Sequence, residues 1–78
     1  MDLKINDQTF TNVSIAGTTT VLTANIEGLT TTSGSATVLL LGVSLVGTFS
    51  HVELGDAVIT SYVDDVVEIT HTGFIPRA

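Results

Sequence analysis

Two histidines and a few neighbouring acids are the residues of this 78-residue chain whose types and spacing come closest to metal chemistry. His51 and Glu53 are two residues apart, which places both side chains on one face of a strand, and Asp56 follows closely. A hydrolytic zinc site needs three protein ligands in fixed geometry. A surface histidine beside a turn is the simpler interpretation, and we expect His71 to be an edge or interface residue rather than a base.

Asp64, Asp65 and Glu68 form a second group that could supply oxygen ligands to a calcium ion. Their spacing does not follow the calcium loop of an EF-hand, which takes ligands from positions 1, 3, 5 and 12. Paired aspartates are also typical of tight turns, because aspartate tolerates a positive φ. We therefore expect a turn here, with no metal and no cofactor.

The motifs of nucleophilic and phosphate chemistry are missing from the sequence. There is no cysteine, no G-x-S-x-G elbow and no G-x-x-x-x-G-K-[ST] loop, and Lys4 is the only lysine. The aromatic residues are three phenylalanines and Tyr62, with no tryptophan, so a sugar-binding platform is poorly equipped. The sequence predicts a non-enzymatic protein.

The charge balance excludes two classes of partner. The net charge is −6, and Lys4 and Arg77 are the two cations. Nucleic acids and anionic membranes both attract basic surfaces, so we expect neither as a partner. An acidic mimic of DNA would need dense carboxylates on one face, whereas most acids here stand singly beside turn-forming residues. The start, M-D-L-K-I-N-D, lacks the features of a signal peptide, so we expect synthesis in a host cytoplasm.

Thr, Val and Ile make up 30 of the 78 residues, and these β-branched side chains suit a pleated sheet better than a helix. Alternation and glycine punctuation predict an all-β domain over residues 1–73, a small sandwich or barrel of six to seven short, mostly antiparallel strands. A short helix between Thr48 and Val66 is the weaker alternative. The expected strands are 2–5, 8–15 with a bulge near Asn12, 18–27, the stretch 36–49, 48–54, 57–63 and 66–72. Residues 29–35 are expected to be a wide loop or an exposed arm.

The stretch from Ala36 to Phe49 is the most apolar part of the chain. Within it, Val38 to Leu41 shows no alternation, which is typical of a strand buried on both faces. The rest of so small a domain can cover one face, so we expect a second subunit to cover the other. Leu40 or Leu41 should then face a partner.

Residues 74–78 are expected to form a C-terminal tail. Pro76 cannot donate a hydrogen bond to a ladder, so regular pairing should stop before it. Phe74 and Ile75 are apolar for a free terminus, which predicts docking on a neighbouring subunit. The alternative is that Phe74 folds back onto its own core.

Charged residues make up only 13% of the chain, about half the usual share, while 44% are hydrophobic. In length and composition, without a shared motif, the chain resembles the small virion proteins of tailed bacteriophages, of the capsid decoration (cement) or tail type. The resemblance implies a virion structural protein that forms a homo-oligomer, such as a trimer, and docks on a major capsid or other virion protein. The alternative function is a small acidic module that binds a protein or a glycan, as inhibitors and adhesins do. The expected assembly interface consists of Val38, Leu39, Leu40, Leu41, Phe74 and Ile75.

Overall fold

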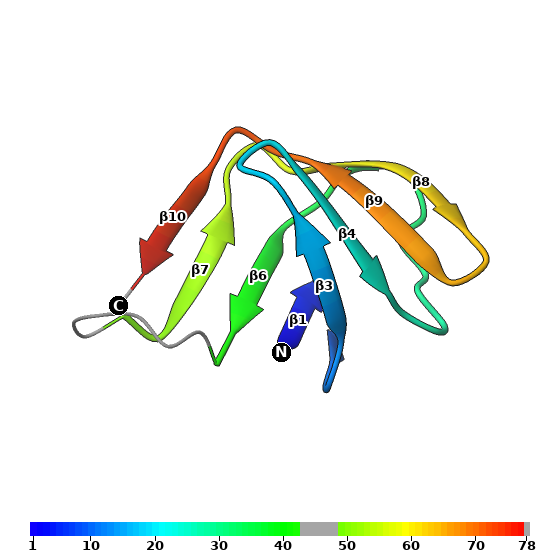
Figure 1. Ribbon diagram of the computed structural model, residues 1–78, viewed down its shortest axis with the longest axis horizontal. Coiled ribbons are helices and arrows are strands. Elements are labelled where there is room, and N and C mark those ends of the chain that lie inside the picture. Colours follow the sequence, from blue (N-terminus) through cyan, green and yellow to red (C-terminus); the bar gives the residue numbers. More distant parts are fainter. Residues whose placement is uncertain (43–48, 78) are drawn as a thin grey trace.

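The computed structural model describes residues 1–42 and 49–77, and every regular element within these ranges is a β-strand. The strands form two antiparallel sheets of five strands each, which we call sheet A and sheet B (Figure 1). The all-β prediction is confirmed. The predicted number of six to seven strands is wrong, because the described part of the chain contains ten. The helix considered as an alternative is absent from residues 49–66.

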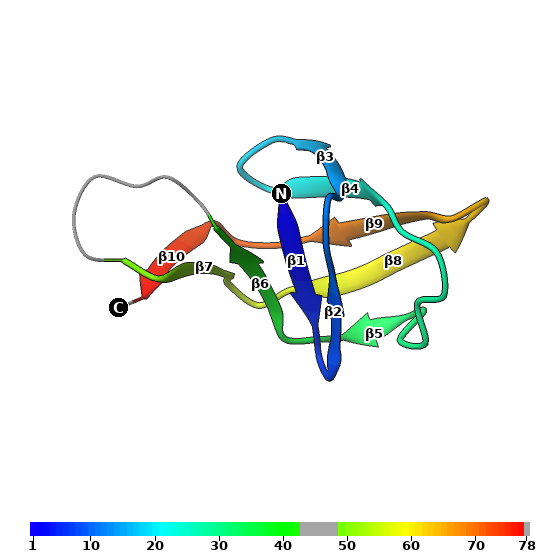
Figure 2. The same ribbon diagram turned by 90° about the horizontal axis from the view of Figure 1, so that it is seen from below.

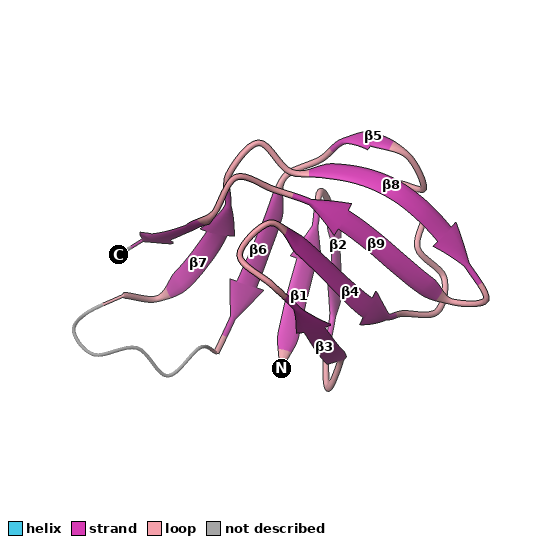
Figure 3. Cartoon of the chain, turned by 45° about the horizontal axis from the view of Figure 1, so that its top comes forward, coloured by secondary structure: helices cyan, strands magenta, loops and turns pink. Residues whose placement is uncertain are grey.

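The strands of sheet A come from both ends and the middle of the chain: β1 (Asp2–Ile5), β2 (Gln8–Phe10), β6 (Val38–Leu41), β7 (His51–Leu54) and β10 (Phe74–Arg77). The strands of sheet B are β3 (Ser14–Gly17), β4 (Val21–Asn25), β5 (Gly34–Ser35), β8 (Val58–Val63) and β9 (Val66–Thr70). Sheet A has the order β10–β7–β6–β1–β2, and sheet B has the order β3–β4–β9–β8–β5. Figure 3 shows the turns and loops that connect them.

One hydrophobic core joins the two sheets. Alternate residues of each strand point to opposite faces, and the apolar set of each sheet points inward. Sheet A contributes Leu3, Ile5, Val38, Leu40, Val52 and Leu54, and sheet B contributes Leu22, Ala24, Ile59, Val67 and Ile69. Each fully buried aliphatic side chain of this kind stabilises the fold by about 1.5–3 kcal/mol relative to its exposed state. In β4 and β9 the buried residues, Leu22 and Ala24 in one strand and Val67 and Ile69 in the other, follow the alternation expected of half-buried strands.

The predicted strand 8–15 is in fact two strands in different sheets. Asn12 has a φ of 55°, and the chain turns there from β2 in sheet A to β3 in sheet B. The backbone N–H of Asn12 donates to Oδ1 of Asp2 at 3.2 Å, and the N–H of Val13 donates to the carbonyl of Met1 at 2.8 Å. The expected bulge is thus a crossing between sheets, which lets Val13 enter the core.

Residues 29–35 are held against the domain and include the short strand β5, which differs from the expected loop or arm. Leu29 is buried, and the Tyr62 hydroxyl donates to the carbonyl of Ile26 at 2.7 Å. Gln8 binds this segment and the residue before it: its Nε2 donates to the Gly28 carbonyl at 2.9 Å, and its Oε1 accepts from the Thr30 N–H at 2.7 Å. These contacts satisfy backbone groups that strand pairing leaves open.

Tyr62 reaches that position because β8 contains an irregularity. The ladder between β8 and β9 shifts register between Ile59 and Ser61. Strict alternation along 57–63 would place Ile59 and Tyr62 on opposite faces, whereas both pack on the core. An extra residue in one strand changes the face to which all later side chains point.

The C-terminal residues form a strand rather than a tail. Phe74–Arg77 pairs with β7 as an edge of sheet A, and Pro76 lies opposite Val52. The expectation that pairing stops before Pro76 is wrong. Proline is tolerated on an edge strand when its nitrogen faces away from the neighbouring strand, because no N–H is needed there. Ala78 lies outside the described residues.

Candidate functional site

Strand β6 presents two different faces. Val38 is fully buried and Leu40 is 7% exposed, while Leu39 and Leu41 lie on the outer face and are half-buried. The apolar run is therefore divided between the chain's own core and its surface. Val38 and Leu40 pack in the chain's own core, so Leu41 rather than Leu40 lies on the outer face, and the expected assembly interface stays a prediction. Residues 43–48 of the apolar stretch lie outside the described residues.

Phe74 and Ile75 lie side by side on the edge strand β10 and point to opposite faces. Phe74 is 46% exposed and Ile75 is 38% exposed. The ring of Phe74 lies 5.0 Å from the ring of His71 at an angle of 56°, so one side of Phe74 contacts its own domain. The large exposed fractions leave both side chains available to a neighbour, and their docking stays a prediction.

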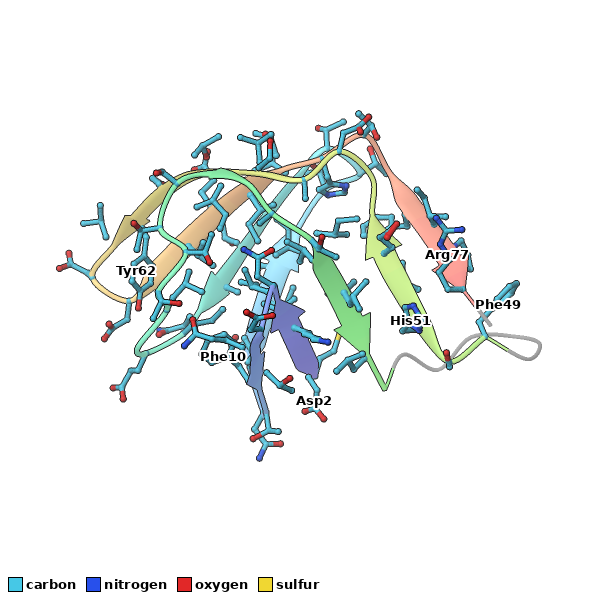
Figure 4. The ribbon with its side chains drawn as sticks, turned by 180° about the vertical axis from the view of Figure 1, so that it is seen from behind. Asp2, Phe10, Phe49, His51, Tyr62 and Arg77 are labelled. Carbon is cyan, nitrogen blue, oxygen red and sulfur yellow. The ribbon has the colours of Figure 1, made fainter. Side chains whose placement is uncertain are left out.

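The outer face of sheet A surrounds Leu39 and Leu41 with charges of both signs. Paired residues of a ladder share a face, which yields two rows across the sheet. The first row is Ile75, Glu53, Leu39 and Lys4, and the second is Arg77, His51, Leu41 and Asp2. Figure 4 labels Asp2, His51 and Arg77 on β1, β7 and β10. We call these eight residues the A face.

Charge is distributed unevenly between the A face and the rest of the molecule. Both cations of the chain, Lys4 and Arg77, lie on the A face together with Asp2 and Glu53, so its formal charge is zero. Nη2 of Arg77 lies 3.2 Å from Oε2 of Glu53. The six other acids, which carry the entire net charge of −6, lie elsewhere on the chain: Asp7, Glu27, Asp56, Asp64, Asp65 and Glu68.

The structure does not bring the candidate metal ligands together. Among the described residues, there is no group of three or more histidine, aspartate or glutamate side chains close enough to hold a metal ion. His51 and Glu53 share the A face, but Glu53 pairs with Arg77, and Nδ1 of His51 lies 2.8 Å from the Ser50 hydroxyl. Asp56 lies in the turn after β7.

The three candidate calcium ligands, Asp64, Asp65 and Glu68, also have separate roles in the fold. Asp64 and Asp65 form the two-residue turn between β8 and β9, with φ values of 52° and 63°. Two successive positive φ angles are typical of the hairpin turn whose twist matches that of the strands. Glu68 is directed instead to the Thr60 hydroxyl, which donates to its Oε1 at 3.2 Å.

An open, polar depression in the described surface has a volume of about 470 Å³. It lies where the ends of β6, β7 and β8 meet, and Asn6, Glu53 and Asp56 contribute its polar side chains together with small hydroxyl residues. Asn6 is already engaged, because its Oδ1 accepts from the Thr37 N–H at 2.9 Å and its Nδ2 donates to the Thr31 hydroxyl at 3.0 Å. These groups support the fold and could also contact a polar ligand from solvent.

His71 is buried, which the sequence analysis did not anticipate. It is 5% exposed, its Nδ1 lies 3.4 Å from the carbonyl oxygen of Gly73, and its Nε2 has no hydrogen-bond partner in the described structure. Its own backbone N–H donates to the Thr20 carbonyl at 2.9 Å, which places the ring at the end of β9. A lone histidine near a strand end gives no sequence signal for burial.

We expect His71 to fill space rather than to provide polar bonds. His71→Leu has a similar volume and removes an unpaired buried nitrogen, so the free energy of unfolding should change by no more than about 1 kcal/mol. His71→Ala should lower it by about 2–3 kcal/mol, because a cavity remains. Urea denaturation of both variants measures this difference, and equal losses would show that the imidazole nitrogens are needed.

Comparisons with protein-family models, with curated proteins and with solved structures found no match for this chain. No helix of the described residues is long and apolar enough to cross a membrane.

Proposed function

We propose that this protein is a non-enzymatic structural subunit of a virus particle, of the capsid decoration or cement type, folded as a small β-sandwich. In this role it contacts other copies of itself and a major capsid protein or another virion protein. Its place is on the outside of the particle, because an acidic surface is repelled by packaged nucleic acid.

The observation that carries the proposal is that exposed apolar side chains occur at both ends of the molecule. One group lies along β10 and beside its end: Phe49, Phe74 and Ile75 are 44%, 46% and 38% exposed, with Phe74 and Ile75 on opposite faces of the strand. The other is the tip of the β8–β9 hairpin, where Val63 and Val66 are 66% and 40% exposed. Figure 2 shows β10 and this hairpin at opposite ends of the long axis. A subunit of a lattice needs separate contacts for different neighbours.

Exposed apolar contacts, their repetition over a lattice and the net charge of the chain support the same function. Exposed apolar side chains gathered at particular places mark contact sites on small proteins. A contact that is weak in one subunit becomes strong when many copies bind the same lattice together. The net charge of −6 keeps the free protein soluble before it assembles.

A second candidate function is a small acidic module that binds a protein or a glycan. The open depression of about 470 Å³, with Glu53 and Asp56 at its wall, favours it. Such a binder acts as a free molecule, whereas a lattice subunit is present in particles.

Heating particles with and without the protein tests the first proposal. Particles assembled without it should package their genome and infect under mild conditions, but release nucleic acid at a lower temperature, because the missing lattice contacts no longer hold the shell. A dye that fluoresces on released nucleic acid records the transition. Adding the purified protein back should restore the original temperature, and particles that release their genome at the same temperature in both cases would overturn the proposal.

A further inference from the structure

We propose that the A face is a self-association surface, on which a second copy of this chain packs face to face about a two-fold axis parallel to β6. This inference rests on the proposed function, since it identifies the contact between like subunits. Its support is the pattern of charged and apolar residues on the A face.

The A face has an apolar centre with one acid and one base on each side. Leu39 and Leu41 of β6 lie in the middle. On one side β1 carries Asp2 and Lys4, and on the other side β7 and β10 carry Glu53 and Arg77. In the first row the base Lys4 and the acid Glu53 therefore lie on opposite sides of Leu39, and in the second row the acid Asp2 and the base Arg77 lie on opposite sides of Leu41.

A two-fold axis parallel to β6 superimposes each side on the opposite side of the partner copy. In the first row, Lys4 then faces Glu53 of the other copy, and Leu39 faces its own equivalent. In the second row, Asp2 faces His51 of the other copy, with Arg77 beside it. A two-fold contact uses the same surface on both subunits, so this surface must be complementary to itself, as the A face is.

The distribution of charge favours self-association through the A face over self-association through any other surface of the chain. Outside the A face the charged side chains are all acids, so a contact between two other parts of the surface has no lysine or arginine to offset them. Like charges placed opposite each other disfavour the wrong partner or the wrong orientation. The neutral A face is the surface on which two acidic molecules can approach without this repulsion.

Pairing through the β10 edge is disfavoured by Pro76. The Gly55 N–H donates to the Gly73 carbonyl at 3.0 Å, and hydrogen-bonded and non-hydrogen-bonded pairs then alternate along the ladder. Phe74 and Pro76 consequently direct their backbone groups toward the open edge. Pro76 has no N–H, so this edge lacks a donor that an added strand would need. Association through the A face does not need the backbone donor that Pro76 lacks.

Sedimentation velocity of the full chain at about 100 µM tests the proposal. We expect a species of twice the 8.1 kDa chain mass. Lys4→Glu and Glu53→Lys, each alone, should raise the dissociation constant about tenfold or more, because each reversed charge acts at two equivalent contacts. An equimolar mixture of the two variants should restore the dimer, because only the mixed pair places unlike charges at both contacts. Glu68→Lys on sheet B is the control and should retain the dimer.

Three results would overturn the two-fold A-face contact. They are a monomer at this concentration, a mass of three chains, or a mixture that associates no better than its components. Circular dichroism of each variant must show the wild-type β spectrum. If a charge variant unfolds, Leu39→Lys replaces it in the comparison of dissociation constants with the wild type, where it should also weaken the dimer because Leu39 faces its own equivalent. A monomeric wild-type protein that is still found in particles would reject this contact while leaving the structural function in place.

Discussion

Leu40→Asp should unfold the domain, whereas Leu41→Asp should leave it folded and dissociate the assembly. Leu40 is 7% exposed within the core, and a carboxylate buried there without a partner costs more than about 4 kcal/mol. The whole stability of a small domain is about 5–15 kcal/mol, and 78 residues place this chain at the low end. Leu41 lies on the outer face of the same strand, so its carboxylate stays in water and is destabilising only where a second copy approaches.

Circular dichroism and sedimentation separate the two variants. Leu40→Asp should lose the β spectrum at every concentration. Leu41→Asp should keep the spectrum and sediment as a monomer where the wild type does not. Two unfolded variants would contradict the division of β6 into a core face and a contact face, and so would a fully associated Leu41→Asp protein.

Gly17→Ala should lower the free energy of unfolding by about 3 kcal/mol or more. A Cβ at Gly17 would overlap the carbonyl oxygen of Val21 and lie 2.8 Å from Cα of Leu22. These are backbone atoms of the neighbouring strand β4, and the same Val21 carbonyl accepts from the Thr18 N–H at 2.7 Å. Relief therefore requires β3 and β4 to separate, which disturbs the core around Leu22.

Gly28→Ala is the matched control for the same substitution. Gly28 has a φ of 76°, and no atom lies within 4 Å of the added Cβ. Its cost is limited to the left-handed backbone, about 1–2 kcal/mol. Urea denaturation of both variants compares them. Equal losses would show that backbone conformation, rather than the close approach of β4 to Gly17, sets the requirement for glycine.

The apolar run Val38–Leu41 shows which part of the fold could be predicted from the sequence and which part could not. Four consecutive apolar residues cannot reveal which pair faces the core. Pairing with β1 decides it, because Leu3 and Ile5 lie opposite Leu40 and Val38. The alternation of β1 was visible in the sequence, but its neighbour in the sheet was not, since β1 and β6 are separated by about thirty intervening residues.

Three other features of the fold depend on contacts between distant residues, which a local sequence pattern does not predict. Pro76 ends a strand in general, yet it fits β10 because that strand is an edge. The register shift near Thr60 places Tyr62 on the core, where its hydroxyl holds the Ile26 carbonyl. The neutral charge of the A face arises only when Lys4 and Arg77, at opposite ends of the chain, meet in one sheet.

The most direct test of the structural function is quantitative mass spectrometry of purified particles. We expect this chain to be present in a fixed ratio to the major shell protein, and we expect the ratio to survive repeated gradient purification. Absence of the chain from such particles, or a ratio that falls toward zero with each gradient, would contradict it and leave the free acidic binding module as the function to pursue.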